Sequence, residues 1–192
     1  MAYPIGTRLP SPPIITIASR LSVGGAFARI GAGVAATGAS PWSVTANSIL
    51  AFPFVLETQT ICYKGVWVNG GTVGSNYEVG IWDNAASPNK IITTGSVAAA
   101  GSANVPQAAA FTSTVTLPPG QYYAGIAHNA TTTAHISRWS LATTGAAFWQ
   151  SFGCWLQAGI TLGSLAATAT PADMTNVAFP LFGIITRTVF DA

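Results

Sequence analysis

The sequence predicts an all-β fold, and two observations carry this prediction. Nine segments from residue 47 onward are apolar or alternate between apolar and polar residues, and turn residues separate them. None of these segments has the periodicity of a convincing helix. A chain of 192 residues can bury one core, so we expect a single antiparallel β-sandwich. The predicted strands are 48–56, 60–68, 76–82, 91–97, 111–117, 121–128, 134–141, 152–162 and 177–188.

The clearest of these signals lies between residues 60 and 83. Two runs rich in β-branched and aromatic residues, 61–68 and 77–82, flank a segment of Gly, Asn and Ser that tolerates positive φ, which predicts a β-hairpin. Further along, Pro118-Pro119-Gly120 predicts a tight turn with a positive φ at the glycine. Gly183 is the expected point at which the last strand passes from one sheet to the other.

The N-terminal part has a different composition. Residues 1–13 contain four prolines, which fix φ and withhold amide donors, so this stretch is predicted to be an extended arm. Residues 22–40 are rich in Gly and Ala and are interpreted as a loop. We therefore divide the chain into an arm and loop, 1–46, and a β-sandwich domain, 47–192.

One motif inside the loop resembles a cofactor signature by letter. Gly-Ala-Gly-Val-Ala-Ala at 31–36 follows the dinucleotide pattern, which needs a strand before it and a helix after it. Gly38 and Pro41 would break that helix. The sequence therefore predicts no cofactor.

Charge is scarce in this chain. Charged residues make up 6% of the sequence, against about 25% in an average globular protein. A monomer normally keeps a charged surface, so a neutral one predicts that other subunits cover it; a free protein with a bland surface is the alternative. The net charge of +2 comes with scattered Lys and Arg, so no nucleic-acid partner is expected. The sequence shows neither a secretory signal nor a transmembrane helix, so no membrane partner is expected.

Residues that could carry chemistry are few. Cys62 and Cys154 are interpreted as buried free thiols, with a disulfide between them as the alternative. His128 and His135 could supply half of a metal site, but the local sequence completes no ligand set, so polar residues at a loop mouth are the preferred interpretation and no metal is predicted.

The carboxylates give no clear catalytic pair. Glu78 and Asp83 are five residues apart on one predicted strand, so they should point to opposite faces. Asp83 is expected to cap the turn that follows it. We predict no catalytic site.

Several short motifs between Leu50 and His128 occur in a characteristic order. They are an aromatic-proline-aromatic opening, a Gly-x-x-Val strand, a Gly-Ile-Trp-Asp strand, a Gly-x-Val strand end and a Leu-Pro-Pro-Gly-x-Tyr-Tyr strand. The residues are Phe52-Pro53-Phe54, Gly65-Val66-Trp67-Val68, Gly80-Ile81-Trp82-Asp83, Gly95-Ser96-Val97 and Leu117-Pro118-Pro119-Gly120-Gln121-Tyr122-Tyr123. In this layout the chain resembles a domain of tailed-bacteriophage virion proteins.

The resemblance implies a jelly-roll-like β-sandwich that serves as a structural or adhesive module of the virion. It brings no catalytic site, because the shared positions are turns and core residues. The leading hypothesis is a capsid decoration or other outer-surface protein, assembled in the host cytoplasm as a homotrimer and bound to the major capsid protein or other virion proteins. The arm would contact neighbours through Tyr3, Pro4, Ile5, Arg8, Leu9, Pro12, Pro13 and Arg20.

The alternative hypothesis is a host-attachment module at a tail or fibre tip. Six tryptophans are many for this length, and a row of exposed aromatic rings could stack on a glycan of the host surface, although cores and interfaces also favour aromatic residues. The glycan-binding candidates are Trp139, Trp149 and Trp155. A free carbohydrate-binding protein or a hydrolase is a third, weaker reading.

Overall fold

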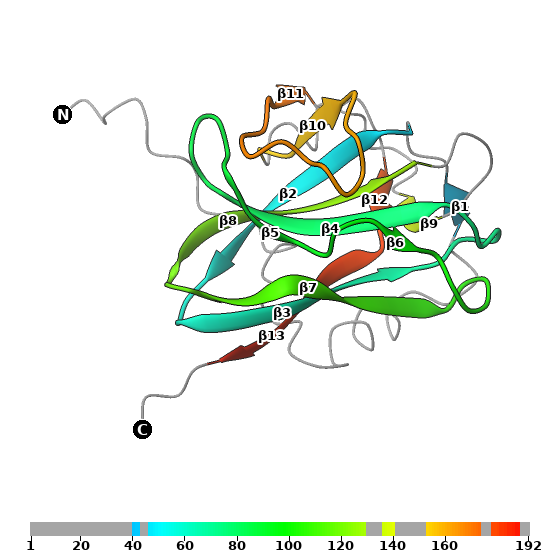
Figure 1. Ribbon diagram of the computed structural model, residues 1–192, viewed down its shortest axis with the longest axis horizontal. Coiled ribbons are helices and arrows are strands. Elements are labelled where there is room, and N and C mark those ends of the chain that lie inside the picture. The colour runs from blue at the N-terminus through cyan, green and yellow to red at the C-terminus, as the bar shows by residue number, and fades with distance from the viewer. Residues whose placement is uncertain (1–39, 43–45, 130–135, 141–152, 174–177, 189–192) are drawn as a thin grey trace.

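The computed structural model describes residues 40–42, 46–129, 136–140, 153–173 and 178–188 (Figure 1). This part of the chain contains no helix, and so none that could cross a membrane. Every strand pair in it is antiparallel, as in the pairing of β2 with β8 and of β3 with β7. The prediction of an all-β fold is therefore confirmed. The proline-rich stretch 1–13 lies outside the described residues.

Thirteen strands are present in the described residues. They are β1 (Ser40–Trp42), β2 (Ser48–Leu56), β3 (Thr60–Val68), β4 (Asn76–Asp83), β5 (Lys90–Thr93), β6 (Val97–Ala98), β7 (Pro106–Leu117), β8 (Gly120–His128), β9 (Ile136–Ser140), β10 (Trp155–Ala158), β11 (Ala172–Asp173), β12 (Ala178–Pro180) and β13 (Phe182–Thr188).

These strands form three sheets. The largest has the order β11-β10-β2-β8-β4-β5, with β6 also paired to β4. The second is β13-β3-β7 and the third is β1-β9-β12. Figure 1 shows β13, β3 and β7 as a layer beneath β2, β8 and β4. The chain changes layers repeatedly: β2 lies in the large sheet, β3 in the second, and β4 in the large sheet again.

The predicted hairpin over residues 60–83 is wrong. β3 pairs with β13 and β7, whereas β4 pairs with β8, β5 and β6, so the segment 69–75 connects two layers. The rings of Trp67 and Tyr77 stack across the core at 5.2 Å. Strand-forming residues around a flexible connection are common to hairpins and to connections between sheets, and the sequence does not distinguish the two.

The turn after β7 also connects the two layers. Pro118 and Pro119 lie between β7 and β8 as predicted, and the Tyr122 hydroxyl donates to the Pro118 carbonyl at 2.9 Å. The expected positive φ at Gly120 is wrong, because this glycine does not have a left-handed backbone. The two prolines make the change of direction.

The end of the chain passes from one sheet to another, as predicted, but at Leu181 and not at Gly183. β12 pairs with β9 in the third sheet and β13 pairs with β3 in the second. Leu181 joins both neighbours, because its N–H donates to the Ser137 carbonyl at 2.8 Å and its own carbonyl accepts from Val68 N–H at 2.9 Å.

The predicted first and last residues of the strands agree with the structure to different degrees. The predictions for β2 and β3 match the observed strands, whereas β7 begins at Pro106 and the predicted strand 152–162 is reduced to β10. β1 lies within the segment 1–46 that we assigned to the arm and loop, and it pairs with β9.

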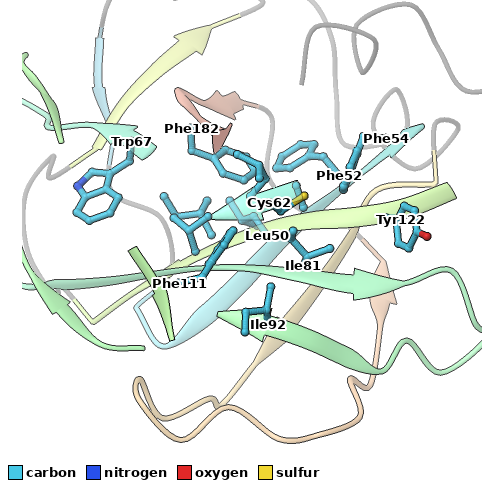
Figure 2. Close-up of a cluster of buried hydrophobic side chains, with 14 of the residues drawn as sticks. Leu50, Phe52, Phe54, Cys62, Trp67, Ile81, Ile92, Phe111, Tyr122 and Phe182 are labelled. Carbon is cyan, nitrogen blue, oxygen red and sulfur yellow. The ribbon is translucent and has the colours of Figure 1, made fainter. Parts of the chain in front are cut away.

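The main core lies between the large sheet and β13-β3-β7. Figure 2 shows its aromatic side chains, among which Phe52 and Phe182 have ring centroids 5.7 Å apart. The buried members are Leu50, Phe52, Phe54, Leu56, Cys62, Trp67, Tyr77, Val79, Ile81, Ile92, Phe111, Leu117, Tyr122, Ala124, Ile126, Ile136, Cys154, Phe182 and Ile184. Burial of this much apolar surface is the main stabilising contribution to such a fold.

Both cysteines belong to this core, and both are free thiols, so the first interpretation of Cys62 and Cys154 is confirmed. Burial raises the pKa of each thiol to about 12, from an ordinary value of 9.0. Burial likewise raises the pKa of Tyr77 to about 12, with a smaller opposing effect from a hydrogen bond to Ser75. Apolar surroundings disfavour the charged forms of these groups.

A buried asparagine ties three parts of the fold together at one end of this core. The Asn69 side chain accepts from the indole N–H of Trp67 at 3.2 Å and donates to the carbonyls of Ala100 and Ser102. Its backbone carbonyl accepts from the Ser137 hydroxyl at 2.7 Å. Asn69 thus provides hydrogen-bond partners for buried polar groups of three segments: β3, β9 and the loop before β7.

The thiols make the stability of the fold depend on pH in the alkaline range. Between pH 9 and 12 the folded chain keeps protons that the unfolded chain has lost, so their contribution is complete below pH 9 and decreases as pH rises. We expect a loss of about 1.4 kcal/mol per pH unit for each thiol that is ionised only in the unfolded chain. Urea denaturation from pH 8 to 11 under reducing conditions measures this loss.

The control is the double variant Cys62→Ala/Cys154→Ala, which retains Tyr77. It should be less stable at pH 8, because its core is less well packed, but its stability should fall less steeply above pH 9. An unchanged slope in the variant would show that the thiols do not cause the pH dependence.

Candidate functional site

The three central strands of the large sheet, β2, β8 and β4, are buried on both faces. On β4, Tyr77, Val79 and Ile81 belong to the main core, whereas Trp82 belongs to a second cluster on the opposite face. This second cluster comprises Ile49, Ala51, Trp82, Tyr123, Ala127, Trp155, Ile160, Leu165 and Ala169. We call this side of the sheet the outer face.

Small residues form the floor of the outer face. Gly125 pairs with Ala51 on β2 and with Gly80 on β4. A Cβ atom on Gly125 would lie 2.7 Å from Cζ3 of Trp82, and one on Gly80 would lie 2.8 Å from Cη2 of the same ring. The Trp82 indole can therefore lie against the sheet only because both positions are glycine.

Two further aromatic rings complete the cluster. The Trp155 ring meets Trp82 edge to face, with centroids 5.9 Å apart and planes at 86°. It meets Tyr123 in a similar arrangement at 5.7 Å and 65°. These are favourable geometries for aromatic pairs, and we call the three rings the aromatic cluster.

An irregular segment, residues 159–171, covers the cluster, and we call it the strap (orange in Figure 1). Ile160, Leu165 and Ala169 are its buried residues and pack into the cluster. Backbone hydrogen bonds fix both ends of the strap. Ile160 N–H donates to the Asn47 carbonyl at 3.0 Å, and Ala169 N–H donates to the Pro88 carbonyl at 2.8 Å.

Two charged residues of opposite sign fasten the middle of the strap. Glu78 is 1% exposed, and its carboxylate accepts from Gly163 N–H at 2.6 Å. The Lys90 ammonium donates to the Leu165 carbonyl, and Lys90 N–H donates to the Ala167 carbonyl at 2.7 Å. Hydrogen bonds to charged groups are stronger than neutral ones, so Glu78 and Lys90 supply the main polar contacts of the middle of the strap.

Asp83 caps the turn that follows β4, as predicted. Its carboxylate accepts from the backbone N–H groups of Ala85 and Asn89 and from the Asn89 side chain, at 2.8 to 3.1 Å. Partial burial acts to raise the pKa of Asp83, but these hydrogen bonds outweigh it and the pKa is lowered. Glu78 and Asp83 bind different segments, so each has a structural role.

The histidines show no ligand set. His128 is 2% exposed at the end of β8, with its ring centroid 6.1 Å from that of Tyr77. It is the last residue of β8 and its side chain is buried, and His135 lies outside the described residues. Within the described residues, no three His, Cys, Asp or Glu side chains gather as metal ligands would.

The residues predicted to bind partners lie mostly outside the described part. This holds for all eight arm residues, from Tyr3 to Arg20, and for Trp149. For Trp139 only the backbone is described, in β9. Trp155 is 5% exposed within the aromatic cluster. It occupies a core position under the strap, so its ring is not an open platform for a glycan in this structure.

The exposed surface of the described part is almost free of charge. Its exposed charged side chains are Glu57, Lys64 and Asp173, among residues whose exposure is described. The other exposed positions hold Ala, Gly, Ser, Thr, Pro and Asn, except for Gln59 and Val105. The composition predicts a surface with few charges, but it does not predict where on the fold this surface lies.

Part of this uncharged surface is continuous across three segments. A Cβ atom on Gly163 in the strap would lie 3.3 Å from Cβ of Ser96, and one on Gly95 would lie 4.0 Å from Cγ2 of Thr112. The strap, residues 95–96 and the exposed Thr112 of β7 thus adjoin one another. We call this surface the neutral band. It offers neither a nucleophile with a base nor a cluster of charges, and what it can do is pack against another surface.

Comparisons with protein-family models, with curated proteins and with solved structures give no match for this chain.

The glycine floor of the outer face leads to a stability prediction. Gly125→Ala places a methyl group against the Trp82 ring and 3.0 Å from Cγ2 of Ile49, so we expect a loss of about 1–3 kcal/mol in the free energy of unfolding. Urea denaturation measures it. Gly120→Ala is the control, because its methyl group would lie 3.5 Å from the Tyr122 ring, in ordinary contact, and should change stability by less than about 1 kcal/mol. Equal losses in the two variants would contradict the close packing of Trp82 on Gly125.

Proposed function

We propose that this chain is a structural protein of a bacteriophage virion, a capsid decoration protein that binds the outer surface of the shell and stabilises it. The observation that carries the proposal is the uncharged exposed surface. Among the residues with described exposure, the exposed stretch 100–106 and the exposed residues within 158–172 contain no charged side chain. A surface of this composition suits burial against other subunits better than lifelong contact with water.

The strand order supports a jelly-roll-like β-sandwich. β8 lies between β2 and β4 in the large sheet, while β3 and β7 are neighbours in the facing sheet. The chain changes layers after β2, β3 and β7, as it must when distant strands are brought side by side in two sheets. We propose that the facing sheets are the two halves of such a sandwich.

The motifs shared with phage virion domains have structural roles here. Trp67 and Trp82 are buried in the two cores, Asp83 caps a turn, and Tyr122 bonds the Pro118 carbonyl. Positions of this kind define a fold and leave the surface free to vary. They are consistent with a resemblance that implies architecture and location in the virion, without a catalytic role.

Decoration would act through the burial of surface between proteins. A protein that binds only the assembled shell stabilises it by mass action, and a stable contact needs roughly 1,200–2,000 Å² of buried area. The proposed partners are the major capsid protein or other virion proteins and further copies of this chain, in a homotrimer. Lys64 is the one exposed cation whose side chain is described, which gives little support for a nucleic-acid partner.

A host-attachment module at a tail or fibre tip is the second candidate. The observation that favours it is the aromatic cluster, because Trp82, Tyr123 and Trp155 gather on one face of a sheet. In that role the rings would have to become accessible to a glycan.

Binding to particles and binding to cells separate the two candidates. We expect the purified protein to co-sediment with empty capsids and not with host cells. Ser164→Glu puts a charge on the neutral band and should lower capsid occupancy by about tenfold or more, because a buried unpaired charge is unfavourable. Gln59→Glu, next to the exposed Glu57, is the matched control and should bind normally. Binding to cells but not to capsids would refute decoration.

The same assay tests the predicted arm. Deletion of residues 1–13 should reduce capsid occupancy while the thermal unfolding of the remaining chain stays the same. Full occupancy by the shortened protein would show that the arm is not an anchor.

A further inference from the structure

The outer face contains a buried hydrogen-bond donor without an acceptor. Trp155 is 5% exposed, and its indole Nε1–H has no hydrogen-bond partner among the described residues. Buried polar groups are nearly always paired, and an unpaired one reduces stability. Such a group calls for an explanation, and a ligand with an acceptor oxygen would supply one.

The surroundings of this donor have the form of a binding platform. Gly80, Gly125 and Ala51 carry at most a methyl group, the Trp82 ring lies on the two glycines, and the Trp155 ring meets it edge to face. Glu78 lies on the same face of β4, two residues before Gly80. Beneath the strap there are therefore aromatic rings, an unpaired N–H donor and a carboxylate acceptor.

The strap has the properties of a removable cover. It has no regular secondary structure, and most of its residues are exposed. Gly159 and Gly163 have φ values of 71° and 77°, which a glycine adopts without strain. It is held by the hydrogen bond from Gly163 to Glu78, by the two from Lys90, by backbone hydrogen bonds at Ile160 and Ala169, and by the three buried side chains of the strap. A segment fastened in this way can open while the sheet beneath it stays folded.

We propose that the strap is a lid, and that the aromatic cluster with Glu78 is a binding site for a neutral carbohydrate. The C–H face of a sugar ring packs on indole and phenol rings, a sugar oxygen accepts from Trp155 Nε1–H, and a sugar hydroxyl donates to the Glu78 carboxylate in place of Gly163 N–H. The inference rests on the second candidate function, attachment to a host glycan, and deepens it; it does not need the decoration role.

The affinity of a covered site depends on how often the lid is open. The apparent dissociation constant equals the intrinsic one divided by the fraction of open molecules. Weakening the lid should therefore tighten binding, whereas damage to the platform should weaken it. If the strap only stabilises the fold, no carbohydrate should bind, whether the lid is weakened or the platform is damaged.

Hydrogen exchange of the wild-type protein tests the lid without any substitution. The amides of Ile160, Gly163 and Ala169 should exchange at least about 100-fold faster than those of β2, β8 and β4, with little dependence on low concentrations of urea. If the strap amides exchange only when the amides of β2, β8 and β4 also exchange, the strap does not open separately and the lid proposal is wrong.

A carbohydrate array tests the site. The probes are neutral oligosaccharides of hexoses, 6-deoxyhexoses and N-acetylhexosamines. Ile160→Ser/Leu165→Ser should bind at least one of them about tenfold more tightly than the wild type does and should show greater quenching of tryptophan fluorescence by acrylamide. Ala166→Ser, at an exposed strap position, is the matched control and should behave as the wild type.

The change Trp155→Phe keeps a ring but removes the N–H donor, and in the weakened-lid background it should abolish the gain in affinity. Accessible tryptophans without binding to any probe would overturn the site, as would binding that Trp155→Phe leaves unchanged. If the double variant does not fold, Trp155→Phe in the wild-type background keeps the test, because wild-type binding that survives this change also overturns the site.

Discussion

Burial of the three central strands on both faces is the constraint on which the rest of this structure depends. β2, β8 and β4 present apolar side chains to the main core on one side and to the aromatic cluster on the other. A sheet whose two faces are apolar must be covered twice. β13-β3-β7 provides one cover, and the strap provides the other. The glycines at positions 80 and 125 follow from the same constraint, since they make room for Trp82 between sheet and strap.

Three of the few charged residues have structural roles within the fold. Glu78 and Lys90 are used to fasten the strap, and Asp83 is used to close a turn. The exposed surface is left to small neutral side chains, which pack closely against another surface and carry no solvation penalty for charge. A chain built in this way is suited to assembly, and this is the physical basis of the proposed role in a virion.

Much of the fold could be predicted from sequence because its strands have local signals. β2 and β3 combine β-branched and aromatic residues with a polar connection between them and Asn69-Gly70-Gly71 after β3, and their predicted limits match the structure. Sheet membership has no such local signal. The connection 69–75 could have closed a hairpin, and only the strand pairing in the structure, with Trp67 stacked on Tyr77 across the core, shows that it joins two layers.

The outer face was harder to predict than the strands. The strap has three buried anchors, Ile160, Leu165 and Ala169. Together with the half-buried Leu162 they lie among Gly, Ser, Thr and Ala without a helical or strand period. The isolated apolar residues were the available signal. Trp155 illustrates the same difficulty, because a tryptophan in a platform and a tryptophan in a core look alike in sequence. Its burial depends on a segment that packs back onto β10 from later in the chain.

The most direct test of the central claim, that neighbouring subunits cover the neutral surface, is the mass of the purified protein in solution. Native mass spectrometry over a range of micromolar concentrations measures it. The account predicts a closed oligomer, a trimer, in place of the 19.6 kDa monomer. A chain that stays monomeric and soluble at every concentration would contradict it, because its uncharged surface would then be exposed to water with no subunit covering it.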